Sequence, residues 1–271
     1  MTSSSPTPLP SVLPPPAAPV DALFEYLLRL GDDRLVLGHR LSEWCGHAPI
    51  LEEDIALANV ALDLLGQATM FLRLAGEVEG KGRDEDALAY FREAVDFRNC
   101  QLVELPRGDF AFTVVRQFLF DVHAVVLLDA LARGTNADVA AMAAKALKEA
   151  KYHVRHSGEW MLKLGDGTEE SRRRAQRAVD DLWRFTGELF APDAVDREMA
   201  ASGVAPALQE LEPRWEALVR DVLDRATLSA PAGLPRTANQ RGGRTGAHTE
   251  FLGHLLAEMQ IVARSHPGAT W

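Results

Sequence analysis

Histidine and acidic side chains are the residues of this sequence that could hold a catalytic metal. A di-iron site inside a four-helix bundle typically takes one Glu from each of two helices and a Glu-x-x-His pair from each of the other two. The spacing matters because residues three apart lie on one helix face and can reach the same ion. None of the eight histidines has Glu or Asp three positions before it. The sequence therefore predicts no regular di-iron site.

Two acid and histidine pairs within the predicted helices come close to this spacing. Glu149 stands four positions before His153, and Glu250 stands four positions before His254. Each pair shares a helix face, so one carboxylate and one imidazole could meet a single metal ion, and His156 could add to the first pair. A surface pair or a buried hydrogen-bonded couple explains the pattern equally simply, and it is our preferred interpretation because no matching pair stands on a second helix.

Two aspartates belong to the same question. Asp63 and Asp121 stand within apolar helical stretches, where an acid is costly unless it is paired or bound to a metal. With Glu149 and His153 they make up an irregular ligand set for a metal-binding protein. Hydrogen bonds among buried polar groups, for instance between Asp121 and His123 or an arginine, would leave the same pattern.

Arginines form two groups that could bind anions. Arg172, Arg173, Arg174 and Arg177 follow Glu169 and Glu170, which favours a solvated, charge-paired helix face. Three more arginines lie in the Gly- and Pro-rich stretch 231–246, at Arg236, Arg241 and Arg244. That loop could serve a partner surface or a phosphate-bearing ligand, with a plain solvated loop as the alternative.

Composition excludes several classes of function. The 271 residues carry 29 basic and 39 acidic side chains, a net charge of −10, which argues against nucleic-acid or anionic-membrane binding. Phosphate-loop, dinucleotide-binding, HExxH and GxSxG motifs are absent. The two cysteines, Cys45 and Cys100, lie far apart and suit a reducing cytoplasm. We expect a soluble, cytoplasmic protein.

Apolar residues recur at intervals of three and four, and β-branched alternation is scarce, so the sequence predicts an all-α fold. Helices are expected at 21–45, 52–79, 84–103, 110–133, 137–164, 169–190, 206–227 and 248–265. Two long helix pairs joined by a longer connection are typical of a ferritin-like four-helix bundle core, with the C-terminal helices outside it. Residues 1–20 hold seven of the 15 prolines, so we expect a disordered tail before one helical domain, 21–271.

Several longer strings resemble a known family. They are LGDDRLVL at 30–37, EWCGHAP at 43–49, ALDLLGQA at 61–68, KEAKYH at 148–153, LWRFT at 182–186, HTE at 248–250 and LAEMQ at 256–260. In these strings the chain resembles the C subunits of the bacterial phenylacetyl-CoA ring 1,2-epoxidase, over about residues 24–271.

The resemblance implies a ferritin-like subunit of a multicomponent monooxygenase of aerobic phenylacetate catabolism. In that family the A subunit holds the di-iron site and binds the CoA thioester, while the C subunit lacks the metal ligands and pairs with A structurally. A reductase with flavin and an iron–sulfur centre and small accessory subunits complete the assembly. The resemblance thus implies no catalytic residue, metal or cofactor in this chain.

Three hypotheses follow. The first is a non-catalytic structural subunit whose apolar face buries against the A subunit, so that the chain made alone self-associates or aggregates. The second is an oxygenase that binds metal itself through Asp63, Asp121, Glu149 and His153. The third is a CoA-binding or regulatory module that uses the arginine loop.

Overall fold

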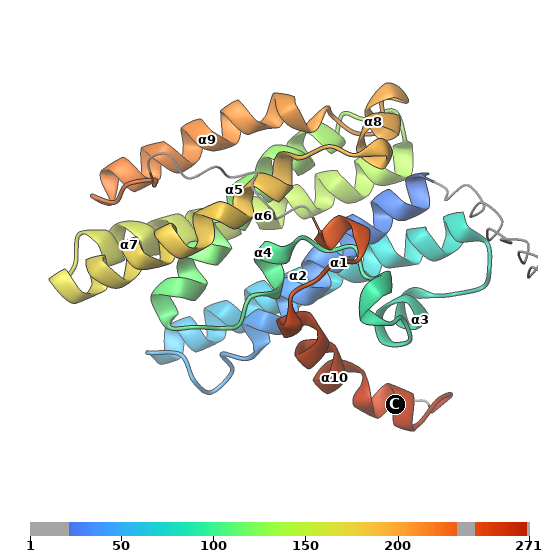
Figure 1. Ribbon diagram of the computed structural model, residues 1–271, viewed down its shortest axis with the longest axis horizontal. Helices are drawn as coiled ribbons and strands as arrows, with labels where there is room; N and C mark the ends of the chain where they lie inside the picture. The colour runs from blue at the N-terminus through green and yellow to red at the C-terminus, as the bar shows by residue number, and fades with distance from the viewer. Residues whose placement is uncertain (1–21, 232–241, 270–271) are drawn as a thin grey trace, which may run out of the picture.

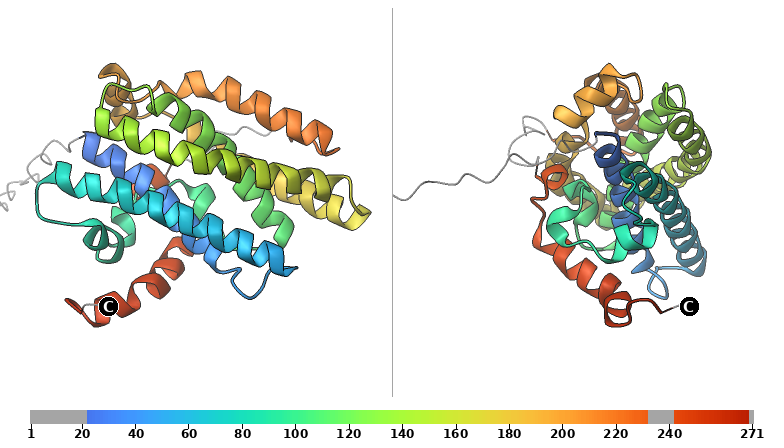
Figure 2. Two further views of the ribbon diagram at one scale, coloured as in Figure 1. Left: turned by 180° about the vertical axis from the view of Figure 1, so that it is seen from behind. Right: turned by 90° about the vertical axis from the view of Figure 1, so that its right-hand side faces the viewer.

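Four long helices form the centre of the molecule (Figure 1). The computed structural model describes residues 22–231 and 242–269, and within these ranges it contains helices and no strand. The central helices are α1 (Ala22–Ser42), α2 (Leu51–Glu79), α5 (Phe110–Leu131) and α6 (Ala137–Gly165). They form two antiparallel pairs, and α2 lies beside α6 on the rear face (Figure 2). The predicted all-α, ferritin-like four-helix core is confirmed.

Local sequence signals define the ends of these helices. Asp109 and Asn136 accept hydrogen bonds from the first-turn amides of α5 and α6, as N-cap residues do. Gly80 ends α2 with a φ of 66°, a conformation that a residue without a Cβ adopts easily. α5 is buried on nearly every side, which agrees with its almost uniformly apolar sequence.

The connection between the two pairs differs from the single helix expected at 84–103. It contains α3 (Glu85–Tyr90), a 3-10 turn η1 (Ala94–Asp96) and α4 (Gln101–Glu104), with irregular backbone between them. Two carboxylates of α1 hold the irregular backbone that precedes α4. Asp32 accepts a hydrogen bond from the backbone N–H of Arg98, and Asp33 accepts one from that of Cys100. Because those amides bond to side chains, they cannot continue a helical ladder.

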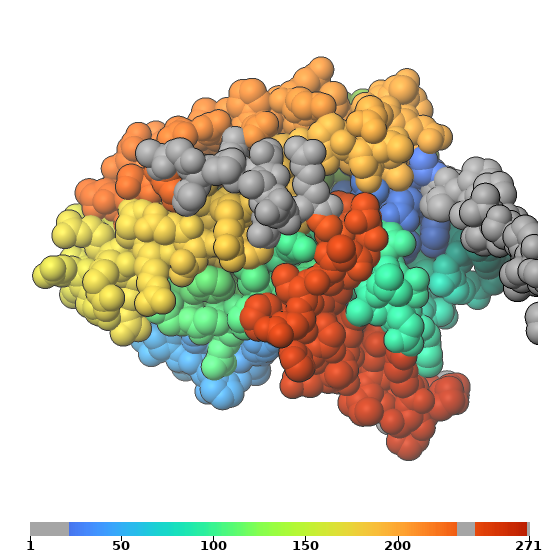
Figure 3. Space-filling model, viewed as in Figure 1, coloured from blue at the N-terminus to red at the C-terminus, as the bar shows by residue number. Residues whose placement is uncertain are grey.

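The remaining helices pack outside the core. They are α7 (Glu169–Trp183), the 3-10 segment η2 (Arg184–Phe190), α8 (Ala194–Ala201), α9 (Leu208–Arg225), the 3-10 turn η3 (Gly243–Thr245) and α10 (Glu250–Ser265). The predicted helix at 169–190 therefore changes to 3-10 geometry at Arg184. α8 was not expected from the sequence, although Asp193 caps it. α10 extends away from the body of the molecule (Figure 3).

Two central helices, α2 and α5, are long and apolar enough to span a membrane by length and composition. In α5, 89% of the most apolar window is buried within the bundle, as in the core helix of a soluble protein, but in α2 only 44% is. α2 therefore presents an apolar side that the rest of the described chain does not cover. The proline-rich stretch 1–20, Arg236 and Arg241 lie outside the described residues.

Candidate functional site

A layer of polar side chains crosses the interior of the four-helix core, where a ferritin-like protein would hold its metal ions. His153 of α6 lies 3.0 Å, by Nε2, from Oδ2 of Asp63 on α2. The imidazole is buried, whereas the Asp63 side chain is 41% exposed. Two of the four candidate ligands are thus brought together, as a pair bonded to each other.

Glu149 belongs to a different part of this layer. Its carboxylate accepts a hydrogen bond of 2.8 Å from the side-chain amide of Gln67 on α2. The amide oxygen of Gln67 in turn accepts one of 2.9 Å from Nε of Arg34 on α1. Arg34 is 2% exposed, and its guanidinium lies over the ring of Phe71. The guanidinium of Arg34 therefore places a positive charge of the protein itself inside the core.

Asp121 of α5 is the fourth candidate. Its two carboxylate oxygens accept hydrogen bonds from the amide of Gln117 at 2.6 Å and from the hydroxyl of Ser157 at 2.8 Å. Burial raises the pKa of Asp121 to about 6, and the nearby His153 opposes that rise. Asp121 and His123 do not form the couple considered from the sequence.

The positions of these four side chains differ from the ligand arrangement of a di-iron centre. Such a centre takes four carboxylates and two histidines pointing at a shared space. Among the residues described, no group of three or more His, Cys, Asp or Glu side chains is arranged to hold a metal ion. The other near-match, Glu250 and His254, lies on α10 outside the core. The donor set of Asp63, Asp121, Glu149 and His153 does not fit a di-iron centre.

The raised pKa of Asp121 gives a testable pH dependence. An aspartate in an unfolded chain titrates near 4, so the folded protein binds this proton more tightly. The stabilisation is fully present below about pH 4 and is lost as the pH rises through about 6. Asp121→Asn removes this effect. We expect urea unfolding to show that wild type loses about 1 kcal/mol more stability than Asp121→Asn between pH 5 and pH 8.

Other acids titrate in both proteins, so the difference between the two curves isolates Asp121. Asp224→Asn, at an exposed position in the last turn of α9, is the matched control and should follow wild type. Parallel curves for wild type and Asp121→Asn would show that Asp121 titrates like an exposed acid.

A second polar cluster joins α1 to the C-terminal part of the chain. Arg244 of η3 forms a bidentate ion pair with Asp33, with N–O distances of 2.9 and 2.8 Å. It also donates a hydrogen bond of 2.8 Å to the backbone carbonyl of Arg98. The Asp33 side chain is 4% exposed. Arg244, one of the loop arginines expected to bind an anion, is therefore already paired with an acid of the protein itself.

Glu104 and Asp32 are further buried acids that were not singled out from the sequence. Glu104 accepts hydrogen bonds from the backbone and hydroxyl of Thr249, both at 2.7 Å, and also pairs with His248. Asp32 pairs with Arg92. The DD dipeptide at 32–33, in the middle of a predicted helix, was the available signal, because two adjacent acids buried there require partners.

One interior cavity is very small and is lined by both charged and apolar side chains. It measures about 20 Å³, near the size of one water molecule, and Tyr26, His123 and Glu188 are among its lining residues. Burial lowers the pKa of His123 to about 3 and raises that of Glu188 to about 7, so burial favours their neutral forms. The cavity is too small for a CoA thioester.

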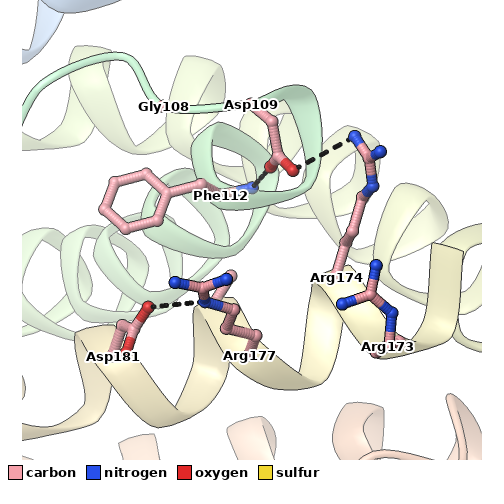
Figure 4. Close-up of a pocket in the computed structure, with 8 residues that line it drawn as sticks. Gly108, Asp109, Phe112, Arg173, Arg174, Arg177 and Asp181 are labelled. Atoms are coloured by element: carbon pink, nitrogen blue, oxygen red, sulfur yellow. Dashed lines mark hydrogen bonds and ion pairs between the residues drawn. The ribbon is translucent and has the colours of Figure 1, made fainter. Parts of the chain in front are cut away.

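A larger groove of about 370 Å³ runs beside α7 (Figure 4). Its arginines are paired with nearby acids: Arg173 and Arg174 with Glu170, Arg174 also with Asp109, and Arg177 with Asp181. This balance of charges agrees with the interpretation of the arginine cluster as a solvated, charge-paired face.

Comparison with known proteins agrees with the resemblance carried by the EWCGHAP and ALDLLGQA strings. A family model described as phenylacetic acid catabolic protein matches residues 12–271. The chain is also similar to the C subunit of the 1,2-phenylacetyl-CoA epoxidase of Escherichia coli (strain K12). The two are 48% identical over 252 residues, which cover 93% of this chain and 100% of the relative. The chain therefore belongs to the phenylacetic acid catabolic protein family.

Proposed function

We propose that this chain is the structural C subunit of a multicomponent oxygenase that converts phenylacetyl-CoA into its ring 1,2-epoxide. The observation that carries the proposal is the 48% identity to a protein named as the C subunit of such an epoxidase, along that protein's whole length. In this role the chain binds and stabilises the catalytic A subunit and has no active site of its own.

The interior polar layer supports a non-catalytic role. Its carboxylates are bonded to Gln67, Gln117, Ser157 and His153, and Arg34 supplies a positive charge within it. Buried acids need partners of this kind to be tolerated, and here the protein provides them without a metal ion. The layer therefore works as a structural element of the core.

The remaining parts of the reaction are assigned to other polypeptides. The proposal places the di-iron site and the CoA thioester in the A subunit, and flavin and an iron–sulfur centre in a reductase, with accessory subunits completing the complex. We place the assembly in the cytoplasm, where the free thiols of Cys45 and Cys100 stay reduced.

Co-expression tests the proposal. The chain and the A subunit from the same organism should copurify as a stable 1:1 complex, and phenylacetyl-CoA epoxidation should require both. The chain made alone should contain no stoichiometric iron and should self-associate. Separate elution of the two proteins at micromolar concentration, or full activity of A without this chain, would contradict the proposal.

The alternative is an independently metal-binding oxygenase, and the partly exposed pair of Asp63 and His153 is the feature that favours it. Expression with excess iron, followed by metal analysis, separates the two. Near-stoichiometric iron that is lost in both Glu149→Ala and His153→Ala would establish the alternative. A blank result would leave Asp63 and His153 as a structural pair.

A further inference from the structure

α2 carries an apolar stripe on its outward side. The stripe consists of the exposed Leu51, Ile55 and Leu62 and the half-buried Ala58 and Leu65, which follow one another at alternating intervals of four and three. Leu65 ends it against Gly38 of α1. Leu51, Ile55 and Leu62 are 70%, 54% and 66% exposed. Alternating steps of four and three are the spacing with which one helix packs along another. The stripe covers about 14 steps of the helix, or about 21 Å at 1.5 Å per residue.

The same side of α2 leaves room for a close neighbour. Gly66 lies on the exposed part of the helix, and a Cβ added there would meet no other atom within 4 Å. A small residue on an exposed helix allows another backbone to approach closely. Large apolar side chains around a small residue make a surface suited to receive a helix.

α6 lies beside α2 on this face and is basic (Figure 2). Four of the five lysines of the chain are on α6, and Lys145, Lys148 and Lys151 are exposed. These three pair with no acidic side chain among residues 22–231 and 242–269, and Tyr152 beside Lys151 is 60% exposed. In a protein of net charge −10, this is a local concentration of unpaired positive charge.

We infer that the outer surface of α2 and α6, which carries the apolar stripe on one helix and the lysine row on the other, is the docking surface for the A subunit. The inference rests on the proposed function and adds the place and the chemistry of the contact. The occupant is a helix of the A subunit that is apolar along one side and acidic along its flank. A second copy of this chain fits less well, because it would set its own lysine row on α6 against the first one, and like charges oppose each other.

The test uses full-length protein co-expressed with the A subunit and compares matched pairs of substitutions. Ile55→Glu with Leu62→Glu places two charges in the stripe. Leu218→Glu with Ile261→Glu places two charges at apolar residues of α9 and α10 that are 44% and 59% exposed. We expect the first pair to weaken binding of the A subunit at least 100-fold and the second to leave it within threefold.

Charge reversal tests the lysine row separately. Lys148→Glu with Lys151→Glu should weaken binding about tenfold in dilute buffer and much less in 0.5 M salt, because salt screens exposed charges. The isolated variants should unfold in urea as wild type does, since every substituted residue is exposed. That control excludes misfolding as the cause of lost binding.

The binding results separate a failure of the proposed function from a failure of the docking face. If wild type does not bind the A subunit, both the proposed function and this inference fail. If wild type binds and the stripe variant binds equally well, only the docking face is wrong. If the stripe variant instead abolishes a homodimer of the isolated chain while the complex with A persists, the occupant is a second copy, and the inference is likewise overturned.

Discussion

Arg244→Met is expected to lower the free energy of unfolding by about 3–5 kcal/mol, because it leaves the buried carboxylate of Asp33 without its charged partner. Nearby charges, Asp33 first among them, raise the pKa of the Arg244 guanidinium above its ordinary value despite its burial. Asp33 would keep only the hydrogen bond from Cys100 N–H among the contacts described above. Urea unfolding followed by circular dichroism measures the loss.

The matched control is Arg220→Met. Arg220 pairs with Glu216 along α9, but both side chains are substantially exposed, and such a pair contributes less than about 1 kcal/mol. The double variant Asp33→Asn with Arg244→Met should lose less stability than the sum of the two single changes, because it removes the unpaired charge. A loss below about 1 kcal/mol for Arg244→Met would mean that water reaches and solvates Asp33.

Trp215→Ala should cost about 3–5 kcal/mol, the range for removing a large aromatic side chain from a close-packed interior. Trp215 on α9 is fully buried, and its indole N–H donates 3.0 Å to the carbonyl of Leu119 on α5. Its ring packs against Trp183 and Phe190 at centroid distances of 5.7 and 5.2 Å. The substitution therefore loosens the outer helices from the core.

Two comparisons give this prediction its control. Trp215→Phe retains most of the packing and should cost clearly less than Trp215→Ala. Leu218→Ala, about one turn further along α9 at a residue that is 44% exposed, should cost less than about 1 kcal/mol. Equal losses for Trp215→Ala and Leu218→Ala would show that the outer layer is only weakly coupled to the core.

The long helices could be predicted from the sequence, because each has a local signal such as the Asp109 cap of α5 or Gly80 at the end of α2. The interruption of the helix expected at 84–103 has no such local signal in the sequence. The backbone there is held by Asp32 and Asp33, which lie more than 60 positions earlier in the chain. Local propensity carries no information about a partner at that separation.

The hydrogen-bond partners in the candidate site were likewise out of reach of local sequence patterns. Spacing alone showed that no histidine follows an acid by three positions, and this already argued against a di-iron site. The actual partners of Glu149 and Asp63, which are Gln67 and His153, stand 82 and 90 positions away from them. Gln67 and Arg34 carried no chemical signal of their own, although both lie within strings that resemble the family. The face on α2 could be found only once the structure showed which apolar residues were left uncovered.

The pair of Asp33 and Arg244 also has a consequence for how the protein is made. The two residues are separated by 211 positions, so Asp33 leaves the ribosome long before its partner has been synthesised. Translation at roughly 5–20 residues per second leaves α1 with an unmatched carboxylate for about 10 s or longer. The first helix can complete its packing only when nearly the whole chain has emerged. A nascent chain that stops short of residue 244 therefore leaves Asp33 without its partner. Correct packing of α1 in this subunit thus depends on the C-terminal part of the chain.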